Sequence, residues 1–496
     1  YTAYVCGTKL ESGKKYLVTH KLVPHPYKGQ QLVMLIYATE QANDSVTNFK
    51  VTSENIEHLK VIQDIPGTVH EKIETMTERF KALLGYNGNN QLIQAMDLAY
   101  NTALQFHFGQ FRDVRAYLDT LIVSESRVGK SSTADALRKV YGLGICASLA
   151  GNAATIPGLI GGSNKTANGY QTRAGIIPQN HKGLIVFEEL GKSNNSVIAE
   201  LTDIRSSNEV RISRVAGTLS LPAIVRMIAL SNVKTDDGTS RPIASYPHGI
   251  SILSDLIGAA EDIARYDMIL ILSDRANRDI DPFWEAPEPL PEEALRTRIR
   301  WIWSRTPEQI IIAPEIGRYI IEQANELNHT FSCHIKIFGT EAWKKLARLS
   351  IAVAGYVVSS SEDYQNIVVL KEHVEFARDF MLALYDNPTF KLREYAEHER
   401  MFATIDDAGV ELLQDIYNRC PALVHYLEQA DRATRNTLIS VSGLSNDEYN
   451  AQINRLTSGL FVVHSKYDIV PTERFRLGLS RINRTPFIRP IREVGV

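Results

Sequence analysis

Apolar and polar positions divide the first part of the chain into two kinds of segment. Residues 1–65 contain short apolar runs separated by Pro-His-Pro and Lys-Gly turn signals, which is typical of β-strands; the runs are Tyr16–Val18, Lys21–Val23 and Leu32–Tyr37. Helical spacing follows, with Ile73, Met76 and Phe80 on one face and a second apolar helix expected from about Leu92 to Phe106. The pattern predicts a small β-rich domain at 1–65 and a helical linker region at 66–115. Such a β domain is either an oligonucleotide-binding (OB-like) barrel or a purely structural module.

From residue 116 to residue 280, short apolar runs alternate with helical segments. This alternation predicts an α/β domain whose parallel sheet is covered on both faces by helices. Because strands that are buried on both faces are continuously apolar, we expect strands at five places: 120–124, 143–149, 183–188, 224–231 and 268–272.

The remainder of the chain predicts two further domains and a tail. A Pro- and Glu-rich stretch, Asp281 to Glu293, is typical of a linker, and helical patterning over 281–395 predicts a helical lid. Residues 400–482 suggest three helices followed by two strands, at Leu460–Val463 and Phe475–Leu477. That order is a winged-helix pattern, in which Ser442–Ser445 makes the turn before a recognition helix at Asp447–Leu456. A basic tail is expected at 483–496.

Composition limits the class of protein without identifying it. Of the 496 residues, 44% are apolar and 22% are charged, and no apolar run has membrane-spanning length, so we expect a globular cytoplasmic protein with no membrane partner. The four scattered cysteines are read as reduced thiols; Cys6 could form half of a zinc knuckle, but Ala3 occupies the place of its partner. The net charge of −3 does not indicate nucleic acid, although an Arg-rich end (Arg474, Arg476, Arg481, Arg484, Arg489, Arg492) is either a binding segment or a solvated tail.

The segment Ser124–Ser131 has the layout of a phosphate-binding loop. It follows the apolar run Leu121–Val123 and precedes a helical segment, so its backbone N–H groups and the helix dipole could hold phosphates. In that reading Lys130 neutralises the β and γ oxygens and Ser131 reaches a magnesium ion. The copy is imperfect, because Ser124 stands where the first glycine is expected. The predicted nucleotide-binding residues are Ser126, Arg127, Val128, Gly129, Lys130, Ser131 and Ser132.

Two later strand ends carry polar groups that suit nucleotide hydrolysis. The apolar run Gly183–Phe187 ends in Glu188 and Glu189, as in a Walker B motif: Glu188 would hold the magnesium shell and Glu189 would polarise the attacking water. The run Met227–Ser231 ends in Asn232, which could position water or contact the γ-phosphate as a sensor. Solvated glutamates and a turn asparagine are the alternative readings, and the order of the motifs favours ATP with Mg²⁺.

Basic residues outside these strand ends suggest contacts beyond the nucleotide. Arg265 comes just before the last apolar strand, where in a ring it could reach the neighbouring subunit's γ-phosphate; a surface salt bridge to Asp262 or Asp267 is the alternative. The segment Arg211–Thr218 alternates basic and apolar residues like a hairpin, and its tip arginines, Arg211 and Arg214, would contact phosphates of DNA in a central pore.

These motifs, taken in order, resemble the minichromosome maintenance (MCM) family of AAA+ replicative helicases. The resemblance covers about residues 115–275 well and the following helices loosely. It implies an AAA+ P-loop core in a homo-hexamer, with Ser124–Ser131 as Walker A, 183–190 as Walker B and Asn232 as sensor 1. It also implies that 164–173 are the helix-2 insert, Arg211–Thr218 the pre-sensor-1 hairpin and Arg265–Asp267 the arginine-finger segment.

The chain departs from the family pattern at several positions. The hairpin lysine falls on Val215, next to Arg214, and Glu341 stands near the place of the sensor-2 arginine, which leaves Lys344 and Arg348 as substitutes. The paired cysteines of the family's N-terminal region are absent from the sequence. These departures suggest a divergent relative of the kind that mobile elements or phages carry.

Three functional hypotheses follow. The first is a hexameric, ATP-dependent DNA helicase that moves on single-stranded or forked DNA, with a replication initiator or a primase as a candidate partner. The second is an AAA+ ATPase that remodels a protein, which would lack the steep salt dependence of DNA binding that pore arginines impose. The third is a DNA-binding replication initiator in which the ATPase core only switches shape.

Overall fold

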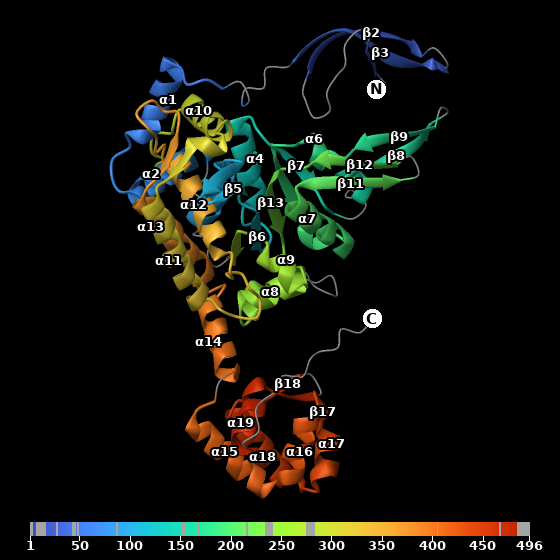
Figure 1. Ribbon diagram of the computed structural model, residues 1–496, viewed down its shortest axis with the longest axis vertical. Helices are drawn as coiled ribbons and strands as arrows, with labels where there is room; N and C mark the ends of the chain where they lie inside the picture. The colour runs from blue at the N-terminus through green and yellow to red at the C-terminus, as the bar shows by residue number, and fades with distance from the viewer. Residues whose placement is uncertain are drawn as a thin grey trace. The chain divides into compact units, whose positions relative to one another are not determined.

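The structure is a computed structural model that divides into two compact units, Tyr1–Leu392 and Arg393–Val496 (Figure 1). It describes residues 3–5, 16–25, 28–41, 46, 49–85, 88–150, 155–166, 169–214, 217–233, 242–273, 283–403, 405–465 and 468–483. Cys6 and the arginines from Arg484 onward lie outside this part of the chain, so neither the zinc-knuckle alternative nor the basic tail is described.

The first unit is built on a five-stranded sheet in the order β14-β6-β13-β10-β7, and every neighbouring pair is parallel. All five predicted strands are present, and each is a run rich in apolar residues. Their bounds are β6 (Thr120–Ser124), β7 (Ile145–Ser148), β10 (Leu184–Glu188), β13 (Arg226–Ser231) and β14 (Met268–Leu272). Every residue of β6, β13 and β14 is buried, whereas β7 at the edge is only partly buried. The predicted α/β core with a parallel sheet is therefore confirmed.

Helices follow the strands as the alternation of the sequence predicts. They are α4 (Lys130–Tyr141), α5 (Ile156–Leu159), α6 (Ile176–Gln179), α7 (Asn195–Ser207), α8 (Gly249–Leu256) and α9 (Ala260–Ala264). Two antiparallel hairpins interrupt this pattern: β8 (Gly161–Thr166) with β9 (Gly169–Ala174), and β11 (Glu209–Arg214) with β12 (Gly217–Pro222). Both hairpins extend to the same side of the sheet in Figure 1. The expected insert at 164–173 is thus itself a strand pair, and the hairpin expected at 211–218 is present.

The region between 66 and 115 is not helical throughout. Helices α2 (Val69–Leu84) and α3 (Asn90–Tyr100) are followed by a hairpin of β4 (Gln105–Phe108) and β5 (Phe111–Arg115). The helix predicted to reach Phe106 ends six residues earlier than expected, because the Asn101 side chain turns back to the carbonyl of Asp97, 2.7 Å away. Phe106 and Phe108 are then buried on alternate positions, which is the period of a strand.

The N-terminal region contains the strands β1 (Ala3–Val5), β2 (Tyr16–His25) and β3 (Lys28–Gln41), in the sheet order β1-β3-β2. The described residues there provide three strands, fewer than the five of an OB-fold barrel. The predicted boundary at residue 65 is wrong, because 53–63 form a helix, α1 (Ser53–Gln63), with Thr52 as its N-cap. Its His58 and Gln63 hydrogen-bond to Thr297 and to the carbonyl of Val358, so this helix packs on the helical region further along the chain.

The lid region is helical as predicted, apart from one short parallel strand pair. It contains α10 (Glu292–Trp303), β15 (Ile310–Ile312), α11 (Pro314–Thr330), α12 (Ala342–Tyr356), β16 (Ile367–Val369) and α13 (Lys371–Tyr385). Leu346, Leu349 and Val353 of the predicted stripe are fully buried on α12. Among the described residues, no helix combines the length and the apolar character needed to cross a membrane.

The second unit has its own apolar core of helices and a three-stranded sheet. Helix α14 (Leu392–Ala403) leads into α15 (Asp407–Arg419), α16 (Pro421–Gln429), β17 (Ala433–Thr434), α17 (Arg435–Ser442), α18 (Asn446–Ser458), β18 (Val462–Ser465), β19 (Asp468–Pro471) and α19 (Glu473–Asn483). Gly443, at φ 66°, makes the predicted turn into α18.

The prediction of a strand at Phe475–Leu477 is wrong. These residues lie in α19, and the partner strand of β18 is β19. Phe475 and Leu479 are buried four residues apart, which is helical spacing, and the Thr472 hydroxyl accepts a hydrogen bond from the Phe475 N–H. Three arginines of the Arg-rich end lie on this helix and form ion pairs with aspartates of the same unit: Arg474 with Asp406, Arg476 with Asp431 and Arg481 with Asp407.

Candidate nucleotide-binding site

The loop between β6 and α4 has the backbone of a phosphate-binding turn. Strand β6 ends at Ser124 and α4 starts at Lys130, with Gly129 at the N-cap position and φ 92°. Arg127 also has a positive φ, 68°, a conformation that non-glycine residues seldom adopt. No side chain of the described residues caps α4, so its first N–H groups remain available for an anion.

Ser124, which replaces the first glycine of the motif, has a hydrogen-bonding role. Its hydroxyl donates to the carbonyl of Glu125 over 2.8 Å and accepts from the Lys130 ammonium group. The Glu125 carboxylate in turn accepts the N–H of Ile243, 2.9 Å away, and so ties the loop to the segment before α8. The departure from the sequence motif therefore leaves the loop closed rather than disrupted.

Lys130 is held by acceptors from two strand ends, those of β6 and β13. Its Nζ donates to the Asn232 side-chain oxygen over 2.9 Å and to the carbonyls of Glu125 and Ser124 over 3.0 and 3.3 Å. Burial lowers the pKa of Lys130 to about 8, although the nearby Glu125 carboxylate acts in the opposite direction. A phosphate anion would provide the counter-charge that this buried ammonium group lacks.

Glu189, the second carboxylate at the end of β10, has two polar partners. Glu189 has a left-handed backbone, φ 61°, and its carboxylate accepts a hydrogen bond from the Ser148 hydroxyl at 3.2 Å. Its other oxygen pairs with Lys192, and this hydrogen bond is the main reason why the pKa of Glu189 is lowered. A low pKa keeps Glu189 ionised, as a group that orients or deprotonates water must be.

The turn after Glu189 contains a glycine that sequence reasoning missed. The Gly191 N–H donates to the Ser231 hydroxyl at 2.9 Å, which joins the ends of β10 and β13. A Cβ atom at Gly191 would lie 2.9 Å from that hydroxyl and 3.0 Å from Leu256. The only signal in the sequence was its position, two residues after the paired carboxylates.

These strand ends and the loop enclose one cavity of about 280 Å³. It gathers the whole predicted nucleotide and metal site; its lining residues are Ser126, Arg127, Val128, Gly129, Lys130, Ser131, Ser132, Glu188, Glu189, Leu230, Ser231 and Asn232. The Ser131 hydroxyl and the Glu188 carboxylate supply two oxygen ligands, which fits Mg²⁺, an ion that keeps waters and takes its remaining ligands from phosphates. No group of three or more His, Cys, Asp or Glu side chains in the described segments forms another metal site.

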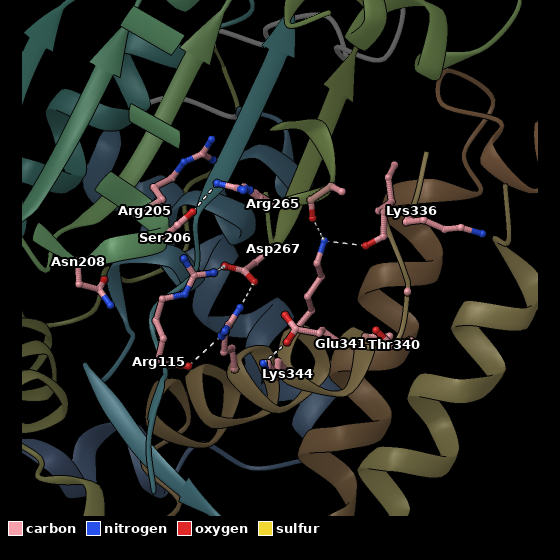
Figure 2. A pocket seen from close by; sticks show the side chains of 16 residues that line it. Arg115, Arg205, Ser206, Asn208, Arg265, Asp267, Lys336, Thr340, Glu341 and Lys344 are labelled. Atoms are coloured by element: carbon pink, nitrogen blue, oxygen red, sulfur yellow. Dashed lines mark hydrogen bonds and ion pairs between the residues drawn. The ribbon is translucent and has the colours of Figure 1, made fainter. Parts of the chain in front are cut away.

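Arg265 does not line this cavity. It lies just before β14 and lines a second cavity of about 500 Å³, shown in Figure 2, where its Nη1 donates to the carbonyl of Thr202 at 3.2 Å and to the Ser206 hydroxyl. The phosphate loop follows the carboxyl end of β6, whereas Arg265 precedes the amino end of the parallel neighbour β14. A five-residue strand separates the two ends by about 16 Å, so Arg265 does not reach the nucleotide cavity of its own subunit.

A buried ionic cluster supports the segment that carries Arg265. Asp267 accepts from Arg115 at 2.7 Å and from Arg348 at 2.5 Å; although burial acts to raise it, these two guanidinium groups hold the pKa of Asp267 below its usual value. Lys345 of α12 donates to the carbonyls of Ala264 and Tyr266. Arg348 therefore binds Asp267 and the Arg115 carbonyl. Of the two suggested sensor-2 substitutes, only Lys344 lies outside this cluster, and it pairs with Glu341.

The two predicted DNA contacts lie on one strand of the second hairpin. Arg211 is exposed on β11 and lies 3.7 Å from the Glu209 carboxylate. Arg214 pairs with Gly217 at the hairpin tip, and its side chain, like Val215, lies outside the described residues. Both positions lie on the projecting hairpin, and Arg211 is not among the residues that line either cavity.

Comparison with known proteins identifies the family of the core. Residues 80–283 match the family model of the MCM P-loop domain. The matched range includes every predicted nucleotide-site residue, the hairpin β11–β12 and Arg265. Among curated proteins, no sequence matches the chain.

Proposed function

Because the chain contains an MCM P-loop domain and is an MCM-like AAA+ protein, we propose that it is an ATP-dependent DNA helicase that works as a ring-shaped hexamer during replication of a mobile element or phage. One observation carries this proposal: the phosphate-loop cavity and the arginine cavity lie at opposite ends of parallel strands. A site divided in this way is complete only when two subunits meet, which a closed ring provides for every subunit.

The chemistry assigned to the first cavity is hydrolysis of the γ-phosphate of ATP. Lys130 and the loop N–H groups would bind the phosphate oxygens, while Ser131 and Glu188 would hold Mg²⁺, which neutralises charge on the β and γ oxygens when bound. Glu189 accepts a proton from the attacking water as its oxygen bonds to phosphorus and the bond to ADP breaks. Asn232, already 2.9 Å from Lys130, would orient the water or the γ-phosphate.

The second subunit completes the site with Arg265. Its guanidinium group is exposed and is held only by uncharged acceptors, Thr202 and Ser206, among the contacts described. Such a group can turn to the neighbour's γ-phosphate, where negative charge develops in the transition state.

Movement would reach DNA through the hairpins. Arg211 and Arg214 lie on the projecting hairpin β11–β12, which follows α7 directly, and α7 follows the turn after Glu189. We infer that the hairpins line the pore and contact the sugar–phosphate backbone of single-stranded DNA. The domain scheme of this proposal is an ATPase core at 116–280, a helical lid and a C-terminal winged helix.

The test is ATP turnover with and without single-stranded DNA, together with strand separation on a forked duplex. We expect DNA-stimulated turnover that Lys130→Ala abolishes and that Arg265→Ala lowers by about 10³-fold or more. Arg318→Ala, on the exposed face of α11 outside both cavities, is the matched control and should retain wild-type rates. Turnover that survives Lys130→Ala would end the proposal.

One observation favours the initiator alternative. The second unit contains helices α17 and α18 joined by a tight turn and followed by the strand pair β18–β19, an arrangement used in sequence-specific DNA recognition. Tight binding to one duplex sequence with little turnover would favour this function over a helicase.

A further inference from the structure

A buried lysine of the lid binds the backbone on both sides of Arg265. Lys345 lies on α12, and only 7% of the residue is exposed. Its Nζ donates to the carbonyls of Ala264 and Tyr266 over 2.7 and 2.6 Å, and to the carbonyl of Ile337 over 2.6 Å. Burial lowers the pKa of Lys345 to about 8. At pH 7 most of these side chains are therefore ammonium groups, whose three N–H donors match the three carbonyls.

The segment that Lys345 binds is the end of a short helix. Helix α9 ends at Ala264, and Arg265 is its C-cap residue. The last carbonyls of a helix have no partner within it, and a cation there is favourable. The Arg265 side chain, by contrast, is exposed and is held by uncharged acceptors of α7. The backbone of this segment is thus fixed, while the guanidinium group can exchange its partners.

We propose that Lys345 is a positioning residue for Arg265: by holding the carbonyls on either side of it, Lys345 fixes the point from which the guanidinium group reaches the γ-phosphate on the neighbouring subunit. This inference rests on the proposed function. Lys345 does not itself contact the nucleotide, because its donors are all bound to carbonyls of its own chain. A contact made in the transition state depends on placement, and a displacement of about 1 Å can cost about 10²-fold in rate.

The first part of the test is the kinetics of the full-length protein. Lys345→Met, which is uncharged and of similar length, should lower kcat for ATP by about 10²-fold. The KM should change less than about twofold, because Arg265 acts on charge that develops only in the transition state. Lys345→Gln retains two amide N–H donors and should recover part of the turnover. The matched control is Lys81→Met, a change at a buried lysine of α2 that pairs with Glu78 and lines neither cavity; its kcat should stay at the wild-type value.

The second part assigns the effect to one side of the subunit interface. Lys130→Ala subunits mixed with Arg265→Ala subunits should regain turnover, because the intact loop of one then faces the intact arginine of the other. Lys345→Met added to the Lys130→Ala subunit, which supplies Arg265, should lower this turnover by about 10²-fold. The same change in the Arg265→Ala subunit, which supplies only the loop, should have little effect.

A merely structural role gives a different result. An equal loss of turnover from either side of the mixed interface would overturn the inference, since it indicates a general loss of structure. So would wild-type kcat in Lys345→Met, or a raised KM with an unchanged kcat. A wild-type protein that hydrolyses no ATP, or parent subunits that regain no turnover when mixed, would overturn the proposed function and the inference with it.

Discussion

The Lys130 side chain lies in a site that is nearly closed to water, and only 9% of the residue is exposed. Burial lowers its pKa to about 8. Because the charged form is disfavoured in the folded protein relative to the unfolded chain, this residue should make the nucleotide-free protein more stable as the pH rises from about 8 to its ordinary value of 10.5. A bound triphosphate would reverse this preference, since it favours the ammonium form.

The first prediction is that nucleotide binding takes up a proton at Lys130. At pH 8.5 most Lys130 side chains are neutral before binding, and uptake should be about 0.75 proton per site, falling to about 0.1 at pH 7. Calorimetry with a non-hydrolysable ATP analogue in buffers of different ionisation enthalpy measures this quantity. Lys130→Arg, which stays charged throughout, should show no such uptake. Equal uptake at both pH values would mean that another group titrates.

A buried ion pair next to the core has a structural role. Arg298 on α10 lies 3.7 Å from Asp97 on α3, and both side chains are fully buried. The Arg298 guanidinium also donates to the Tyr141 hydroxyl at 2.6 Å and to the Tyr356 carbonyl at 3.3 Å. These contacts join α3, the end of the phosphate-loop helix α4 and the lid helices.

The second prediction is that Arg298→Met destabilises the protein by about 3–5 kcal/mol, because it leaves Asp97 buried without its cation. Denaturant unfolding followed by fluorescence measures the loss. The control is Arg296→Met on the same helix, whose partners Glu292 and Glu293 are largely in solvent and whose loss should be smaller. If the two variants unfold alike, Arg298 does not stabilise the core as proposed.

At the scale of elements, segments in which the apolar residues keep one spacing were predicted correctly from the sequence. Segments in which that spacing changes from helical to strand-like, or the reverse, were not. The five core strands were found because each is a run rich in apolar residues, both in the sheet interior (β6, β13, β10) and at its edges (β14, β7). The helix from Leu92 was extended too far because Phe106 continues its apolar face, although the chain turns at Asn101. Phe475 and Leu477 alternate like a strand, and only the buried partner Leu479 identifies the helix.

The candidate site, too, could be predicted only in part from the sequence. Lys130, Ser131, Glu188, Glu189 and Asn232 each lie at or after the end of a predicted strand, and parallel strands bring their carboxyl ends together, so one cavity could be expected. Gly191 was missed, because its need for a small residue comes from Ser231 on another strand.

The third prediction concerns the hairpin β11–β12. If Arg211 and Arg214 contact phosphates, the double change to alanine should weaken single-stranded DNA binding and reduce the slope of log affinity against log salt by about 1.4, or 0.7 per lost contact. Anisotropy titrations at several salt concentrations give this slope. Arg318→Ala should leave it unchanged, and an unaltered slope in the double variant would place the DNA contacts elsewhere.

At the scale of the whole molecule, the chain contains two units with separate cores. The second unit, Arg393–Val496, has a continuous apolar cluster of its own that includes Leu413, Leu427, Leu456 and Phe461, all fully buried. The nucleotide cavity, by contrast, is lined only by residues of the first unit. A ligand that binds one native unit stabilises that unit and leaves an independent one unchanged.

The fourth prediction is therefore that scanning calorimetry shows two transitions and that Mg²⁺ with a non-hydrolysable ATP analogue raises only one of them. At about 100 times the dissociation constant the gain is about 2.7 kcal/mol, which corresponds to a rise of only a few degrees for a unit as large as Tyr1–Leu392. Lys130→Ala should remove this rise and leave the other transition in place. The polypeptide 405–483, expressed alone, should unfold cooperatively at the temperature of the ligand-independent transition. A single transition that shifts as a whole with nucleotide would instead mean that the two units unfold as one.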